Sequence, residues 1–183
     1  RQRQMCIRDR GTTLGDDAIT QSDATGGTSS GTATSVSDLT GLTAAAKNGG
    51  NVQLSGNITL TDTLSINNKK LSIDLNGHTI TAANNQRAFN INGGTLEIKD
   101  SVGNGIIQGN GTVTGHGGAI YMEGSGSALT ISGGTIQGFT ASTSGGGVYM
   151  SGGTFNMTGG AIENCTASEG CLLYTSPSPR DTR

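Results

Sequence analysis

The chain has 183 residues, a net charge of −2 at neutral pH and 32% apolar residues, with only 3% aromatic residues. Glycine accounts for 32 residues, against a usual share of about 7% in soluble proteins. So few large side chains cannot fill one globular core, but they suit a repeat protein in which each repeat buries only a few aliphatic groups.

Both ends of the chain resemble translated sequencing-adapter DNA. One set of codons for Met5 to Asp9 has a reverse complement that encodes Cys171 to Thr175, so one inverted DNA element accounts for both ends. We therefore interpret residues 1–10 and 171–183 as adapter-like artefacts and leave them out of the fold. The alternative is a basic N-terminal arm with a Pro-containing tail. The adapter interpretation also predicts that the chain is a fragment of a longer protein.

Leaving out these ends changes what the composition allows. Residues 11–170 hold five Lys or Arg and eleven Asp or Glu, a net charge of −6, which removes the case for nucleic-acid binding. Of the three cysteines only Cys165 remains, in the position that Phe139 has one repeat earlier. We expect it to be a small buried apolar group, since it supports no disulfide framework, zinc site or Cys–His pair.

The first native residues are predicted to contain a linker and then a helix. Residues 11–35 are rich in Thr, Ser, Gly and Asp and are predicted to be a disordered polar linker. Ser37 is the expected N-cap of a short helix that ends at Gly49-Gly50. We expect this helix to cover the open end of the repeat domain, as a cap does. The alternative is a helix packed on the side of the domain.

The remaining chain, residues 36–170, repeats a β-type pattern. The segment from Gly117 to Ala167 contains two copies of one sequence repeat, in which Ile120 corresponds to Val148 and Leu129 to Phe155. Apolar and polar residues alternate in short segments between Gly-rich corners, which predicts strands with one apolar face. Weaker copies precede these two, and their apolar positions are Val52, Leu54, Ile58, Leu60, Leu64, Ile66, Leu71, Ile73, Leu75, Ile80, Phe89, Ile91, Leu96, Ile98 and Ile107.

Three such strands per repeat predict a β-solenoid, a tube of parallel strands with aliphatic residues inside. Like residues then stack on like in successive windings. This register predicts an outward row of Asn90, Tyr121 and Tyr149 and a second outward row of Glu97, Thr130 and Asn156. Because Gly170 stands where another strand begins, we expect the solenoid to be incomplete and residues 147–162 to be an exposed last rung.

The stretches GNITLTDTLSINNKKLSIDLNGHTI and GGAIY carry a resemblance to a known class. They are similar to right-handed parallel β-helices of the pectin-lyase-like class, above all to repeat-rich bacterial surface proteins, and GGAIY resembles a motif of polymorphic outer-membrane adhesins. The resemblance implies an all-β, right-handed parallel β-helix. It also implies what an enzyme of this class needs, namely acidic clusters with calcium and a basic residue, or paired carboxylates.

The sequence does not supply those clusters. Neither outward row pairs two carboxylates, and Asp74, Asp100, Glu123 and Glu163 are scattered, so we expect them in turns or on solvated faces. His78 is expected at a corner, and His116 has no acidic neighbour in sequence. We identify no catalytic residue, no metal ligand and no cofactor site.

We therefore expect a non-catalytic stalk or adhesin module of an exported bacterial surface protein, located outside the cell or at its surface. Its ligand-binding candidates are Asn90, Tyr121 and Tyr149, whose rings suit surface glycans or host matrix components. We expect no nucleic-acid partner and no membrane insertion of this piece. One alternative is a fragment of a polysaccharide lyase or glycoside hydrolase whose catalytic windings are missing. Another is a mechanical spacer without a ligand.

Overall fold

The structure is a computed structural model and describes residues 32–169 and 173–175. Predicted segments that lie outside the described residues are the N-terminal adapter segment (1–10), most of the linker (11–31) and most of the C-terminal adapter segment (171–172 and 176–183). The described residues form one helix and nineteen strands, and all pairings between the named strands are parallel. The all-β class with parallel sheets is confirmed.

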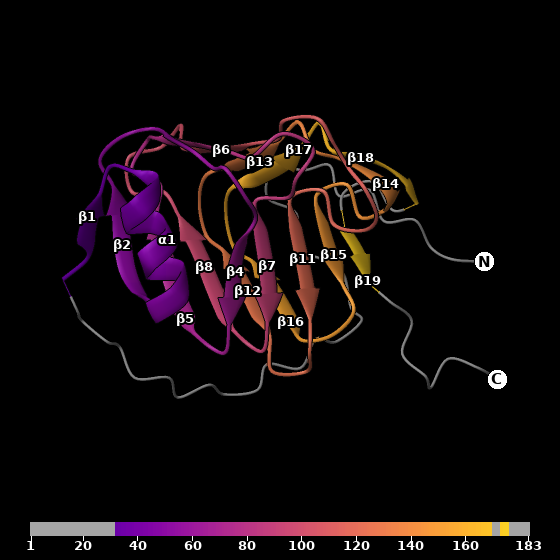
Figure 1. Cartoon of the computed structure of the whole chain (residues 1–183), viewed down its shortest axis with the longest axis horizontal. Coiled ribbons are helices and arrows are strands. Elements are labelled where there is room, and N and C mark those ends of the chain that lie inside the picture. The colour runs from indigo at the N-terminus through magenta and orange to yellow at the C-terminus, as the bar shows by residue number, and fades with distance from the viewer. Residues whose placement is uncertain (1–31, 170–172, 176–183) are drawn as a thin grey trace.

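The strands form four sheets, which we call sheets I to IV (Figure 1). Sheet I holds, in spatial order, β1 (Thr34–Val36), β2 (Gly50–Leu54), β5 (Lys70–Asp74), β8 (Thr95–Lys99), β12 (Ala128–Ile131) and β16 (Thr154–Met157). Sheet II holds β3 (Ile58–Thr59), β6 (Thr79–Thr81), β9 (Ile106–Gln108), β13 (Thr135–Gln137) and β17 (Ala161–Glu163). Sheet III holds β4 (Leu64–Asn67), β7 (Phe89–Asn92), β11 (Ile120–Glu123), β15 (Val148–Met150) and β19 (Leu173–Thr175). Sheet IV holds β10 (Thr112–Val113), β14 (Thr140–Ser144) and β18 (Thr166–Glu169).

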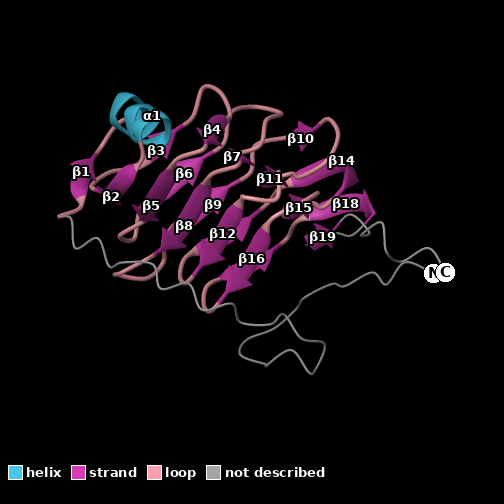
Figure 2. Ribbon diagram, turned by 90° about the horizontal axis from the view of Figure 1, so that it is seen from below, coloured by secondary structure: helices cyan, strands magenta, loops and turns pink. Residues whose placement is uncertain are grey.

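The chain visits these sheets in rotation, so strands that are neighbours in sequence lie in different sheets. After β8 in sheet I it passes through β9 in sheet II, β10 in sheet IV and β11 in sheet III, and then returns to sheet I as β12. Each return places the new strand beside the equivalent strand of the previous pass. Figure 2 shows the resulting row from β1 to β16. We call one such pass a winding. This arrangement is compatible with the predicted solenoid.

The predicted register between windings is confirmed in all three predicted segments. Ile120 pairs with Val148, Leu129 with Phe155, and Ile136 with Ile162. The first strand, β1, begins at Thr34, two residues before the boundary that composition indicated between linker and repeat. At the other end, Leu173–Thr175 pairs with β15 as strand β19. The structure therefore continues sheet III into the segment that we interpret as adapter-derived, and that interpretation stays a prediction.

Sheet IV differs from the expectation of three strands per winding. Its strands appear only from the winding that contains β10 onward, where six more residues separate Phe89 from Ile120 than separate Leu64 from Phe89. The extra residues form a fourth side whose inward residues include Val113 and Ala141, both buried. The repeat pattern did not reveal this side, because each of its strands buries so few apolar groups.

The core is a stack of aliphatic side chains inside the windings. The inward residues of the central windings are at most 1% exposed: Leu71, Ile73, Ile80, Phe89, Ile91, Leu96, Ile98, Ile107, Ile120, Met122, Leu129, Ile131, Ile136 and Val148. In β7, β8, β11 and β12 the residues that alternate with them are less buried, as strand alternation requires. Because adjacent strands lie about 4.8 Å apart, each side chain contacts its equivalents in the windings on either side.

The helix α1 (Leu39–Asn48) lies at the β1–β2 end of the stack (Figure 1). Its N-cap is Asp38 and not Ser37 as predicted, since the Asp38 carboxylate accepts a hydrogen bond of 2.8 Å from the Gly41 N–H. The helix ends at Gly49, whose positive φ of 81° suits glycine. Two of its residues, Leu42 and Ala46, belong to the core, and the helix packs against β2 and β4. It therefore covers the first end of the stack, as expected of a cap.

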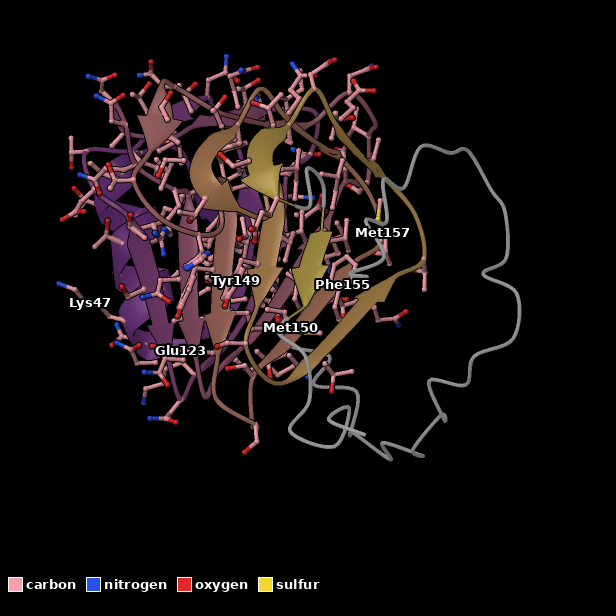
Figure 3. All side chains as sticks on the ribbon, turned by 90° about the vertical axis from the view of Figure 1, so that its right-hand side faces the viewer. Lys47, Glu123, Tyr149, Met150, Phe155 and Met157 are labelled. Atoms are coloured by element: carbon pink, nitrogen blue, oxygen red, sulfur yellow. The ribbon has the colours of Figure 1, made fainter. Side chains whose placement is uncertain are left out.

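The opposite end presents a less buried rung. There Phe155, Met157 and Ile162 are only partly buried, although their equivalents Leu129, Ile131 and Ile136 are at most 1% exposed (Figure 3). Among the described residues, no strand follows β16 in sheet I or β17 in sheet II. The predicted exposed rung is therefore found in sheets I and II, whereas β15 in sheet III carries a further strand.

Candidate functional site

The predicted outward row is present on sheet III. The Cα partners across β7, β11 and β15 are Asn90, Tyr121 and Tyr149, and Ser65 of β4 extends the row at one end. The flanking residues in β11, Ile120 and Met122, are fully buried, so Tyr121 points away from the core. The tyrosines are partly buried, which shows that other groups lie against them.

Those groups form a stack of flat side chains along the row. The rings of Tyr121 and Tyr149 lie 5.3 Å apart between centroids at 10°, and the His116 ring lies 4.5 Å from Tyr149 at 25°. The Arg87 guanidinium carbon lies 5.0 Å from the centroid of Tyr121. We call these four residues, Arg87, Tyr121, Tyr149 and His116, the aromatic stack. The row was predicted, but Arg87 and His116 were not expected in it.

The members of the aromatic stack come from three consecutive windings. Arg87 precedes β7 and so comes from the winding before Tyr121, whereas Tyr149 comes from the winding after it. His116 lies in the corner before β11, and its Nδ1 is 3.1 Å from the Thr143 hydroxyl of the next winding. The stack therefore depends on correct register across three consecutive windings.

Two charged residues lie at the aromatic stack: Arg87, which is a member of it, and Glu123, which contacts the Tyr121 hydroxyl. Burial lowers the pKa of Arg87, and the nearby Tyr121 and Glu123 offset this shift only in part. Glu123 accepts a long hydrogen bond of 3.5 Å from the Tyr121 hydroxyl. Within the part of the chain that the structure describes, the Arg87 guanidinium has no hydrogen-bond or ion-pair partner of its own, so its N–H donors remain available.

A shallow groove of about 370 Å³ adjoins Arg87 on the outside of the windings. Its lining is mainly polar and consists of Asp62, Thr63, Ser65, Asn85, Gln86, Arg87, Asn90, Val113 and Thr114. Thr63 fixes one wall, because its N–H and hydroxyl both donate to the Gln86 side-chain oxygen, at 3.2 and 3.1 Å. The Asn90 side-chain oxygen is buried and has no hydrogen-bond partner. The groove thus combines a fixed wall with unsatisfied polar groups.

A second groove of about 450 Å³ lies between α1 and β4 and shares Asp62, Thr63 and Ser65 with the first. Lys47 of α1 contributes the positive charge there. The two grooves follow one another along the same side of the molecule, from the helix to the aromatic stack. An elongated polar ligand could contact both.

The second predicted row is also in register, with Glu97, Thr130 and Asn156 as partners on sheet I. It contains one carboxylate and, among the described residues, no aromatic contact. It offers fewer recognition groups than the row on sheet III.

The acidic residues at corners have structural roles, as predicted for Asp74 and Asp100. The Asp74 carboxylate accepts from the N–H groups of Asn76 and Ser101, at 3.0 and 2.9 Å, and from the Gln53 side chain at 3.1 Å. Burial raises the pKa of Asp74, but these hydrogen bonds outweigh burial, so the pKa lies below the ordinary value of 3.8. Asp100 accepts from the N–H groups of Gly77 and Gly105, at 2.8 and 2.7 Å. Both carboxylates hold corners of adjacent windings.

His78 and Cys165 also lie where the sequence predicted them. His78 is in a corner, where its backbone N–H donates to the Leu75 carbonyl at 2.8 Å. Cys165 is 5% exposed, and burial raises the pKa of its thiol. In the described ranges no three His, Cys, Asp or Glu side chains gather closely enough to hold a metal ion. The described helix is neither long nor apolar enough to cross a membrane.

In comparisons with protein-family models, with curated proteins and with solved structures, nothing matches this chain.

Proposed function

We propose that the chain is a right-handed parallel β-helix of the pectin-lyase-like class and serves as a non-catalytic stalk or adhesin module of an exported bacterial surface protein. The rotation of the chain through stacked parallel sheets supports the β-helix. The right-handed sense follows from the strong preference of parallel β-crossovers for that hand. The surface location follows from the resemblance in the sequence and from the polar exterior.

The ligand-binding face in this proposal is sheet III around Asn90, Tyr121 and Tyr149. The observation that carries it is the aromatic stack, which is ordered across three windings and borders a polar groove. An amide, a guanidinium and aromatic side chains beside a polar groove are groups that recognise carbohydrates. A surface glycan is therefore the ligand class that we propose.

A glycan array tests this face. We expect the unmodified chain to bind a subset of glycans, and Tyr121→Ala/Tyr149→Ala to reduce that signal by about tenfold or more. The matched control is Thr130→Ala/Asn156→Ala, which changes the outward residues of β12 and β16 on sheet I, the strands that follow β11 and β15 in the chain, and should leave binding unchanged. Tyr121→Phe/Tyr149→Phe keeps the stack and shows whether the hydroxyls matter.

Binding that persists in the alanine double variant would refute the proposed face. The alternative, a fragment of a lyase or hydrolase, predicts cleavage of a polysaccharide once the missing windings are supplied. An activity assay on the longer protein distinguishes the two. If the chain is a spacer without a ligand, it should bind none of the glycans on the array.

A further inference from the structure

The tyrosine rings are not free platforms, although exposed rings are the usual way in which aromatic residues contact sugars. Tyr121 is contacted by Arg87 of the winding before it and by Tyr149 of the winding after it. Tyr149 is contacted by both Tyr121 and His116. Because side chains from both neighbouring windings contact Tyr121, a sugar ring cannot lie flat on it, and a ligand reaches this ring at its edge.

Of the four residues in the aromatic stack, Arg87 is the one that lines the groove. Its guanidinium carries five N–H donors in one plane, and its carbon lies over the Tyr121 ring, 5.0 Å from the centroid, a contact that favours this position of the side chain. The side chain is half-buried and lines the groove, yet no described acceptor pairs with it. A partly desolvated cation without a counter-ion is unfavourable, and an anion placed against it would offset that cost.

The negative charges nearby do not take this role. Glu123 is oriented by the Tyr121 hydroxyl, and its charge offsets the effect of burial on the pKa of Arg87 only in part. Asp62 lines the groove but is exposed, and its Oδ1 accepts the Thr63 N–H at 2.7 Å. Neither forms an ion pair with Arg87. The guanidinium therefore offers an open site for a planar or tetrahedral oxyanion.

We propose that the ligand of sheet III carries an anionic group, a carboxylate or a sulfate ester, which Arg87 binds through its N–H edge, while the stacked rings orient Arg87 and contact sugar only at their edges. This inference rests on the proposed glycan-binding function and specifies the chemical class of the glycan. Carboxylate and sulfate share the oxygen geometry that a guanidinium fork recognises.

The experiment uses an array in which each glycan is printed in three forms: neutral, carboxylated and sulfated. We expect the unmodified chain to bind the carboxylated or sulfated form at least about tenfold better than the neutral form, with a signal that falls as salt rises. The Arg87→Gln variant should lose this preference. Arg87→Lys should keep part of it, because charge remains but the fork is lost. The control Lys99→Gln removes one positive charge from sheet I and should have no effect.

Each outcome decides the matter. Equal binding of the neutral and acidic forms by the unmodified chain would overturn the anionic assignment and leave the proposed glycan-binding function standing. An acidic preference that survives in a folded Arg87→Gln, with an unchanged melting temperature, would overturn the role of Arg87. No binding to any printed glycan would overturn both this inference and the proposed function. Comparison of the carboxylated and sulfated forms shows which of the two anionic groups the chain binds.

Discussion

At the scale of single residues, Asp74 shows how a carboxylate can be structural in a protein with few charges. It is 6% exposed and receives hydrogen bonds from two corner N–H groups and from Gln53 in the neighbouring strand β2. Such a carboxylate stabilises the fold only while it is ionised, since a protonated acid accepts these bonds less well.

The sign of the pH dependence follows from the lowered pKa of Asp74. Its contribution to the free energy of unfolding is fully present above the unfolded value of 3.8 and is lost as pH falls through the lower folded value. We expect Asp74→Asn to be less stable than the unmodified chain at neutral pH, and this difference to shrink below pH 3.8. Urea unfolding at a series of pH values measures it.

The control is Glu97→Gln, which removes an outward carboxylate that has no hydrogen bond among the described residues. It should leave the free energy of unfolding at neutral pH nearly unchanged. A difference between Asp74→Asn and the unmodified chain that stays constant down to pH 2 would contradict the lowered pKa.

At the scale of elements, the corners decide whether each winding can close. Gly117 and Gly145 are equivalent residues in two copies of the repeat and have φ values of 69° and 67°. A Cβ on Gly117 would lie 2.6 Å from the Ile120 carbonyl oxygen, and one on Gly145 would lie 2.5 Å from that of Val148. The same backbone shape therefore recurs at both corners, and both exclude a side chain.

We expect Gly117→Ala to destabilise the protein by at least roughly 1–2 kcal/mol, the cost of a left-handed conformation without the steric overlap. Thermal melting measures the loss. Gly126→Ala is the matched control, because Gly126 lacks a positive φ and the nearest atom to an added Cβ is 3.9 Å away. Equal melting temperatures for the two variants would show that the Gly117 corner can adapt.

The elements that sequence analysis predicted are those with an alternating pattern repeated at a fixed offset. Ile120 and Val148 could be paired because every inward position had a counterpart in the next copy. Sheet IV was missed because each of β10 and β14 buries only one apolar residue, Val113 and Ala141, within a Thr- or Ser-rich segment. Periodicity cannot reveal such a strand.

The candidate site was predictable only where strands form it. Tyr121 and Tyr149 follow from alternation and register, and both lie as expected. Arg87 and His116 come from corners, where no period of two fixes the direction of a side chain. Their contacts depend on how far each corner extends, which the sequence pattern does not specify. The Asp38 cap likewise depended on a local hydrogen bond that two adjacent candidates could have made.

At the scale of the whole molecule, stability is a sum over windings, each held by its neighbours on both sides. A defect in an inner winding therefore weakens two interfaces, whereas the same defect in the last rung weakens one. Ile136 and Ile162 allow a matched test, because they are direct partners in sheet II. Ile136 is 1% exposed, whereas Ile162 is only partly buried.

We expect Ile136→Asp to forfeit roughly 1.5–3 kcal/mol of apolar burial and to add the cost of an unpaired buried carboxylate. Neighbouring windings should then open together, seen as a much lower melting temperature and as fast amide exchange in β9 and β17 as well as β13. Ile162→Asp should cost far less, because its carboxylate can reach water at the exposed rung. Equal losses from the two substitutions would mean that the rungs are not energetically distinct, and normal melting of Ile136→Asp would contradict the stacked aliphatic core itself.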